Sequence, residues 1–440
     1  MINFLRKIMP RKLMLWYHKC WAVLSLFLYG MPSRKMHLIG VTGTNGKTTT
    51  VNLISSILSE AGKKVGMIST VNFRIGEIEW LNNSKMTTGG RLKINKLLRQ
   101  MLNTGCEYAI IEVSSHAISQ SRVWAINFDT AVLTNLTHDH LDYHKDMEDY
   151  KKTKGQLFSD TVSSKKYNNV PKRIILNCDT RAHEYFKQFK GDENYTYGIR
   201  CGSSDFKATD VKLSPEFTEF KAITPKGKIN IKMHLVGAFN VYNALAAIAV
   251  GVSEDVNLKT IRNALEKFDK VPGRMEKINE GQDFTVIVDY AHTPDAFEQI
   301  FKAANDLKKT NARIISVFGA TGDRDKTKRP QLGQIAAKYS TYSFLTLEDP
   351  GSEDPLEIIK QIEPGFKKLG KKENFDYFRV LDRQDAIKRA FEAARPGDIV
   401  LLLAKGHETA MVLKNKKIPW DERQIARKEL RKYLKKYGKK

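Results

Sequence analysis

One short segment, a strand followed by a glycine-rich turn and a helix, constrains the fold of this chain more than any other feature. Residues 37–41 are apolar enough for a buried strand, and a helical pattern runs over residues 47–61. Between them, residues 42–46 read Thr-Gly-Thr-Asn-Gly. Glycines let backbone N–H groups turn toward phosphate oxygens, and the N-terminus of the following helix favours negative charge there. The segment therefore predicts a phosphate-binding loop at the edge of a parallel sheet.

The two residues after the turn supply the polar groups that a nucleoside triphosphate needs. Lys47 would neutralise charge on the β- and γ-phosphates, and Thr48 would offer its hydroxyl to Mg²⁺. A plain glycine turn with a surface lysine is the alternative, but the strand before the turn and the helix after it favour the loop. We therefore expect ATP and Mg²⁺, held by Thr42, Gly43, Thr44, Asn45, Gly46, Lys47, Thr48 and Thr49.

Apolar strand candidates alternate with helical patterns along most of the 440 residues. Those at residues 108–113, 130–133 and 173–176 are typical of a parallel α/β sheet. Residues 217–223 and 228–233 predict short antiparallel strands, and residues 240–250 predict a helix. A linker at 271–274 precedes a second set of strands, at 284–288, 313–318, 343–347 and 398–403. We expect an α/β protein: a basic and apolar N-terminal segment (1–35), a P-loop parallel-sheet ATPase domain (36–271) and a Rossmann-like α/β domain (272–440).

The net charge bears on the binding partners of this chain, and the cysteine spacing bears on the redox state of its thiols. The formal net charge of +24 favours polyanions, nucleic acid among them. A nucleic-acid-binding NTPase would interleave basic and aromatic residues on one surface, whereas the chemistry of this chain is concentrated in its loop motifs. None of the 4 cysteines forms a Cys-x-x-Cys pair, which indicates reduced thiols.

The N-terminal segment is basic and rich in aromatic and aliphatic residues. Its uninterrupted apolar part is shorter than the roughly 20 residues that span a bilayer. Two interpretations stay open: a helix lying on a membrane surface, and a helix packed on the protein's own core.

Acidic residues and histidines follow two of the predicted strands. Glu112 ends the strand at 108–113, at the edge where open α/β sheets bind ligands, and a carboxylate suits Mg²⁺. Residues 135–144 contain three histidines and two aspartates, which by themselves are compatible with a transition-metal site. We expect His138 and His144 at the surface.

The loop Gly43-Thr44-Asn45-Gly46-Lys47-Thr48 resembles the phosphate-binding loop of the Mur ligase family. Further segments resemble motifs of the same family, in the same order along the chain: residues 112–122, 150–158, 237–244, 271–276, 289–294, 319–330 and 404–408. The resemblance implies an ATP-dependent ligase that joins an amino acid to the carboxylate of a muramoyl-peptide through an acyl phosphate. It also implies a cytoplasmic monomer that acts on small molecules and has no nucleic-acid partner. A peripheral contact with the inner face of the membrane through residues 1–35 is a separate expectation, which follows from the composition of that segment.

The same resemblance implies roles for individual residues. Thr48, Glu112, His140 and an N6-carbamylated Lys154 would hold Mg²⁺ and, with Lys47, carry phosphoryl transfer. Further nucleotide contacts would come from Asn240, Asn243, Arg274, Asp289 and His292. The acceptor would meet Thr87, Thr88, Ser114, Gln120 and Arg122, and the amino acid Asp349, Arg383 and Glu408.

Three departures from the family pattern bear on the substrates. Gly351 stands where diaminopimelate-adding members carry the arginine of Asp-Asn-Pro-Arg, which would bind a distal carboxylate. The residues around it are acidic, so we expect an amino acid with a cationic side chain, such as lysine's. Gly89 replaces the proline of a Thr-Thr-Pro acceptor motif. A short basic stretch precedes the loop in place of a uridine-binding domain, which leaves open a lipid-linked acceptor. A folylpolyglutamate- or cyanophycin-synthetase-like ligase, and a non-catalytic membrane-associated module, are the alternatives.

Overall fold

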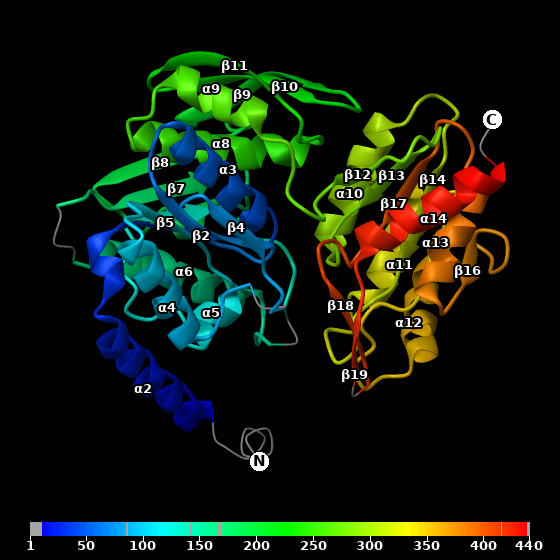
Figure 1. Cartoon of the computed structure of the whole chain (residues 1–440), viewed down its shortest axis with the longest axis horizontal. Helices are drawn as coiled ribbons and strands as arrows, with labels where there is room; N and C mark the ends of the chain where they lie inside the picture. Colours follow the sequence, from blue (N-terminus) through cyan, green and yellow to red (C-terminus); the bar gives the residue numbers. More distant parts are fainter. Residues whose placement is uncertain (1–10, 85–86, 141–142, 166–168, 415, 438–440) are drawn as a thin grey trace.

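The computed structural model describes residues 11–84, 87–140, 143–165, 169–414 and 416–437, with the backbone alone for residues 11–16. These residues form two α/β bodies that lie side by side (Figure 1). Each body is built around its own sheet, and a small hairpin of β18 (Ala410–Leu413) and β19 (Lys416–Pro419) belongs to the second body.

The first sheet has 11 strands within the described residues, in the order β11-β10-β9-β8-β7-β6-β1-β5-β2-β3-β4. Neighbours from β9 to β2 run parallel, and the strands at either end pair antiparallel. The strands are β1 (His37–Thr42), β2 (Val65–Ile68), β3 (Asn72–Ile75), β4 (Ile78–Leu81), β5 (Tyr108–Glu112), β6 (Thr130–Leu133), β7 (Arg173–Asn177), β8 (Glu193–Gly198), β9 (Phe206–Leu213), β10 (Thr218–Thr224) and β11 (Gly227–Met233).

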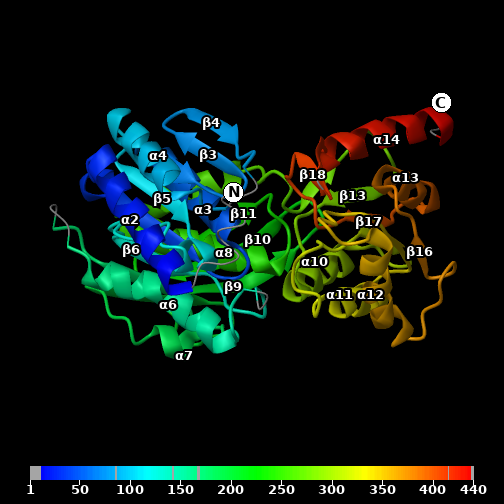
Figure 2. The same ribbon diagram turned by 90° about the horizontal axis from the view of Figure 1, so that it is seen from below.

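Helices cover both faces of this sheet, because its central strands are apolar on both sides. One face carries α3 (Lys47–Glu60), α8 (Ala238–Ser253) and α9 (Leu258–Lys267). The other carries α4 (Arg91–Asn103), α5 (Ser115–Ser119), α6 (Met147–Ser163) and α7 (His183–Phe186). The N-terminal α2 (Arg11–Tyr29) packs on α4, and the short η1 (Pro32–Lys35) leads into β1. Viewed from below, α2 lies across the front of the first body (Figure 2).

The second sheet has the order β12-β13-β17-β14-β15-β16, in which only β12 (Glu276–Ile278) runs antiparallel. Its other strands are β13 (Thr285–Val288), β14 (Ile314–Phe318), β15 (Tyr342–Leu345), β16 (Tyr377–Arg379) and β17 (Ile399–Leu402). One face is covered by α10 (Pro294–Leu307), α11 (Arg329–Tyr339) and α12 (Pro355–Lys367), the other by α13 (Arg383–Ala393) and α14 (Glu422–Tyr437).

The predicted fold class is confirmed: a P-loop sheet is followed by a second, Rossmann-like sheet. The antiparallel strands predicted at residues 217–223 and 228–233 are present as β10 and β11, and they extend the first sheet rather than forming one of their own.

Candidate active site

The glycine-rich loop joins β1 to α3, as its sequence predicts. Gly46 caps the helix with a φ of 81°, and a Cβ there would lie 2.2 Å from Oδ1 of Asn243 on α8. Only glycine satisfies both the conformation and the close approach. The loop therefore packs closely against α8, and its backbone leads directly into the N-terminus of α3.

Lys47 folds back over this loop. Its Nζ donates to the carbonyl oxygens of Gly43 (3.1 Å) and Thr44 (2.6 Å). Burial lowers the pKa of Lys47, while the carboxylates of Glu112 and Asp139 oppose that shift. The ammonium is thus held where a phosphate would take over as its partner.

Glu112 lies at the end of β5, directly beside the loop. Its Oε2 accepts hydrogen bonds from Thr48 Oγ1 (2.9 Å) and Thr70 N (2.8 Å), and its Oε1 accepts one from Thr70 Oγ1 (2.8 Å). A buried carboxylate and a hydroxyl thus share one small volume, which is a hard-oxygen arrangement suited to Mg²⁺.

Lys154 projects from α6 toward the same loop and is 1% exposed. Its Nζ donates to Gly43 O (2.8 Å) and lies 4.5 Å from the ring centre of Tyr150. Burial lowers the pKa of Lys154 well below its usual value, and the nearby Lys47 lowers it further. Both effects favour the neutral amine of Lys154 over its ammonium form.

His140 has a φ of 56° and lies with Nε2 3.2 Å from Asp139 Oδ2. Burial lowers the pKa of His140 to about 2, with His116 as the next cause, so its ring is neutral. The expectation that His144 lies at the surface is wrong: it is 3% exposed and its Nδ1 lies 3.2 Å from Asp149. His138 is half-buried, and residues 141–142 of this motif lie outside the described residues.

A cavity of about 860 Å³ opens between the two bodies next to the loop. Eight of the residues predicted to bind the nucleotide line it: Asn45, Gly46, Thr49, Asn240, Asn243, Arg274, Asp289 and His292. The remaining predicted residues, Thr42, Gly43, Thr44, Lys47 and Thr48, form the strand end and loop beside it.

Asp179 also lines the cavity and belongs to none of the sequence motifs, whereas its neighbour Tyr242 lies within the motif at residues 237–244. Their side chains share a hydrogen bond of 2.8 Å, and Asp179 also accepts from the N–H groups of Ile199, Arg200 and Cys201. The position of Asp179 just after β7, at the carboxyl edge of the sheet, is the signal that identifies it.

The second body reaches the loop directly. Asp295, at the start of α10, accepts from Asn45 Nδ2 (2.7 Å) and Thr137 Oγ1 (3.3 Å). Arg274 Nη2 lies 3.4 Å from Thr48 Oγ1. The cleft is thus closed around the loop by hydrogen bonds from both sides.

The five residues predicted to face the acceptor lie in two segments of the first body, and three of them are joined by hydrogen bonds. Arg122 donates to Thr88 O (2.7 Å) and to Gln120 Oε1 (2.6 Å), and Thr88 Oγ1 donates to Glu112 O (2.9 Å). Ser114 caps α5 through a bond from Ala117 N (3.2 Å), and Thr87 precedes Thr88. This group lies on the side of Glu112 that carries α5.

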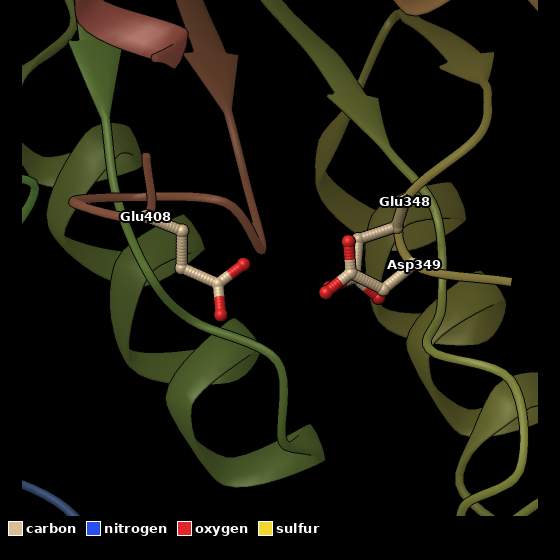
Figure 3. Close-up of side chains that lie close together, drawn as sticks. All are labelled: Glu348, Asp349 and Glu408. Carbon is tan, nitrogen blue, oxygen red and sulfur yellow. The ribbon is translucent and has the colours of Figure 1, made fainter. Parts of the chain in front are cut away.

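Three carboxylates face one another in the second body (Figure 3). Glu348, Asp349 and Glu408 place oxygens within 4.8 Å of one another. Lys405 Nζ lies 2.8 Å from Asp349 Oδ1 and 2.5 Å from Glu408 Oε2. Burial raises the pKa of Glu348, while Lys405 opposes that shift. The cluster thus gathers three acidic side chains around the ammonium group of Lys405.

Arg383, which the resemblance assigns to the amino acid, is fully buried in this structure and is not one of the three clustered residues. Its side chain is 0% exposed and pairs with Glu422 (2.6 Å). It also donates to the carbonyl oxygens of Leu347 (3.1 Å) and Leu403 (2.7 Å). In this structure it positions the strand ends that carry the cluster.

Gly351 adopts a φ of 58°, and a Cβ there would lie 2.1 Å from Asp323 Oδ2. That carboxylate is fixed by bonds from Ser352 N (2.8 Å) and Ser352 Oγ (2.6 Å). A side chain at position 351 would therefore adopt a strained φ and would have to displace the Asp323 carboxylate from its bonds to Ser352.

Comparisons with known proteins agree with this geometry. The Mur ligase middle domain matches residues 41–251, and the Mur ligase, glutamate ligase domain, matches residues 273–406. A UDP-N-acetylmuramoyl-L-alanyl-D-glutamate–2,6-diaminopimelate ligase of Geobacillus thermodenitrificans is 42% identical over 406 residues, 92% of this chain and 81% of that protein. A UDP-N-acetylmuramyl-tripeptide synthetase of Roseiflexus sp. is 41% identical over 419 residues, 93% of this chain and 81% of that protein.

Solved structures show the same fold. A UDP-N-acetylmuramoyl-L-alanyl-D-glutamate–2,6-diaminopimelate ligase superposes with a TM-score of 0.62 at 28% identity, covering 90% of this chain and 79% of the other. A Mycobacterium tuberculosis folylpolyglutamate synthase superposes with a TM-score of 0.70, covering 90% of this chain and 96% of the other; at 14% identity it shows the fold alone. On its sequence, its two domain matches and its fold, this chain belongs to the Mur ligase family of ATP-dependent, amide-forming ligases.

Proposed function

We propose that this chain joins an amino acid to the terminal carboxylate of a UDP-linked muramoyl-peptide, at the expense of ATP. The observation that carries the proposal is the convergence of Lys47, Glu112 and Lys154 on one loop, beside a cavity large enough for a nucleotide. The acceptor is the one named for the relatives at 41–42% identity.

The reaction has two steps. A carboxylate oxygen of the acceptor attacks the γ-phosphorus of ATP, the bond from that phosphorus to the β–γ bridging oxygen breaks, and ADP leaves. The amine of the amino acid then attacks the acyl carbon, the bond to phosphate breaks, and the amine loses a proton. Positioning and charge neutralisation supply most of the acceleration in such transfers. Lys47 neutralises phosphate charge, and Asn240, Asn243, Arg274, Asp289 and His292 enclose the rest of the nucleotide.

Mg²⁺ fits the oxygen ligands beside the loop. We assign Thr48 and Glu112 to it, because they already share a hydrogen bond and present only oxygen atoms. Bound there, Mg²⁺ would offset the charge that moves onto ADP. His140, neutral and adjacent, is the third proposed ligand.

Lys154 is the fourth proposed ligand, as its carbamate. Its neutral amine can attack CO₂, forming an N–C bond and releasing a proton. The product is an anion, which also removes the repulsion between two buried ammonium groups, those of Lys47 and Lys154.

The substrates approach from opposite sides of the loop. Thr87, Thr88, Ser114, Gln120 and Arg122 receive the acceptor next to Glu112. The amino acid enters from the second body, at Asp349 and Glu408. We propose residues 36–271 and 272–440 as the two domains, with residues 1–35 as an appendage and Gly273 as the hinge between them.

We further propose that the incoming amino acid has a cationic side chain, such as lysine's, although several relatives are named for diaminopimelate. Two features support this choice. The cluster at Glu348, Asp349 and Glu408 is acidic. Position 351 carries glycine rather than an arginine that would bind a distal carboxylate, and the Asp323 side chain occupies the space beside it.

We place the enzyme in the cytoplasm as a monomer that acts on small molecules, without nucleic acid. Residues 1–35 give it a contact with the inner face of the membrane.

Phosphate release from ATP and Mg²⁺, with UDP-muramoyl-dipeptide and a panel of amino acids, tests the proposal. We expect release to require both the acceptor and lysine. Release with diaminopimelate in preference to lysine overturns the amino-acid assignment alone. Release that needs no acceptor, or that nucleic acid stimulates, overturns the ligase assignment.

A further inference from the structure

The N-terminal helix α2 has a buried inner face and an exposed outer face. From Tyr17 onward, its inner face buries His18, Ala22, Ser25 and Leu26. Ser25 Oγ donates to Arg91 O (3.1 Å) and Arg99 Nε donates to Tyr29 O (2.7 Å), so α4 fixes the helix to the first body. The position and rotation of α2 are thus set by packing.

The outer face carries large apolar side chains that remain in contact with solvent. Phe27 is 71% exposed and Leu28 is 62% exposed; Tyr17, Trp21, Val23 and Leu24 are 37–47% exposed. Tyr17, Trp21, Leu24 and Leu28 recur at the spacing of one helix face. A contiguous apolar face of this kind marks an interaction site.

The charges near the outer face of α2 indicate which kind of partner it would bind. No aspartate or glutamate occurs in α2, η1 or α4, and none occurs in the chain before Glu60. Lys19, Lys35 and Lys96 are exposed on these three elements. An apolar face with aromatic residues, on a part of the chain whose charged residues are all basic, matches an anionic lipid surface: apolar side chains enter the acyl boundary and basic side chains meet the headgroups.

We infer that the outer face of α2 seats the protein on anionic membrane lipid, with the helix parallel to the surface. Within the described residues, no helix is both long and apolar enough to cross a membrane, which agrees with a surface position. The inference is independent of the ligase reaction, because none of the α2 side chains described, from Tyr17 to Tyr29, lines the cavity.

Co-sedimentation of the full chain with vesicles tests it. We expect binding to equimolar phosphatidylglycerol and phosphatidylcholine, and weaker binding to phosphatidylcholine alone. The double variant Phe27→Glu/Leu28→Glu should lower the bound fraction about tenfold or more, because two exposed anchors become anions. Lys19→Glu/Lys35→Glu should weaken binding to the anionic vesicles only.

Phe375→Glu is the matched control, because Phe375 is 72% exposed on the second body. It should bind vesicles like the unaltered chain. ATP-dependent phosphate release confirms that each variant is folded; if the glutamate pair fails that check, Phe27→Ser/Leu28→Ser replaces it. Absence of vesicle binding, or equal binding by the α2 variants, overturns the inference. So does a lipid-free dimer that the α2 variants dissociate, since the face would then join two copies.

Discussion

Lys154 Nζ donates a 2.8 Å hydrogen bond to the carbonyl oxygen of Gly43, 111 positions earlier in the chain. This bond brings a second buried lysine to a loop that already holds Lys47. Burial is the main cause of the lowered pKa of Lys154. The neighbouring ammonium of Lys47 is the second cause, because two adjacent positive charges in a buried site repel each other.

The first prediction concerns Lys154. Lys154→Arg keeps the cation but cannot form a carbamate, so ligase turnover should fall by about 10²-fold or more, the usual scale for losing one electrostatic group at a phosphoryl-transfer site. Nucleotide binding should persist. Short carboxylic acids should partly restore the ligase turnover of Lys154→Ala, because they supply the missing anion. In a separate measurement, ¹³C-bicarbonate should give a carbamate NMR signal in the unaltered protein and none in Lys154→Arg. Full activity of Lys154→Arg would contradict this role.

The second prediction concerns the bond between Thr48 and Glu112. Thr48→Val keeps the shape of the side chain but removes the hydroxyl. We therefore expect turnover to require a higher Mg²⁺ concentration and to fall by about 10²-fold. Thr50→Val is the matched control on the same helix, since Thr50 makes only a 3.4 Å contact with Asn243. Titration of Mg²⁺ at saturating ATP separates the two variants. Equal effects would mean that Thr48 acts only through packing.

The third prediction concerns the backbone at Gly351. Gly351→Ala combines a positive φ with a clash against Asp323, whereas Gly370→Ala has a φ of 70° and open space. Gly351→Ala should therefore lower the free energy of unfolding by about 1–3 kcal/mol, and Gly370→Ala by less. Chemical denaturation measures the difference. Equal costs would show that Asp323 moves aside freely, and would leave room for an arginine at this position.

The fourth prediction concerns pH and the acidic cluster. Burial raises the pKa of Glu348, so this carboxylate loses its charge at a higher pH than an ordinary glutamate. The kcat/KM for lysine should therefore fall on acidification, beginning above the usual glutamate range. Glu348→Gln can still accept the bond from Thr321; it should lower kcat/KM about tenfold and remove that part of the pH dependence. An unchanged pH profile in Glu348→Gln would assign the titration to another group.

The phosphate loop and ten of the strands were predictable because their signals are local: a run of apolar residues, a glycine, a following helix. Strands such as β2 and β8 were not predicted. The environment of Arg383 was not, since its neutralising partner Glu422 lies 39 positions away on α14. His144 looked like a surface residue in a polar stretch, but α6 folds Asp149 and Tyr150 against it. Asp179 has no motif, and its place at the cavity depends on Tyr242 of α8. Side-chain environments that join distant elements are set by tertiary packing, which a single sequence does not display.

The cavity beside the loop takes its walls from both bodies, with Asn45 and Asp295 bonded across it. Any molecule that fills it acts as a cross-link between two otherwise separate cores. Calorimetry should then resolve two melting units in the empty protein and one when the cavity is filled. Parting of the two bodies would remove the contacts that such a molecule makes with one wall, so we expect its exchange to be coupled to their relative motion.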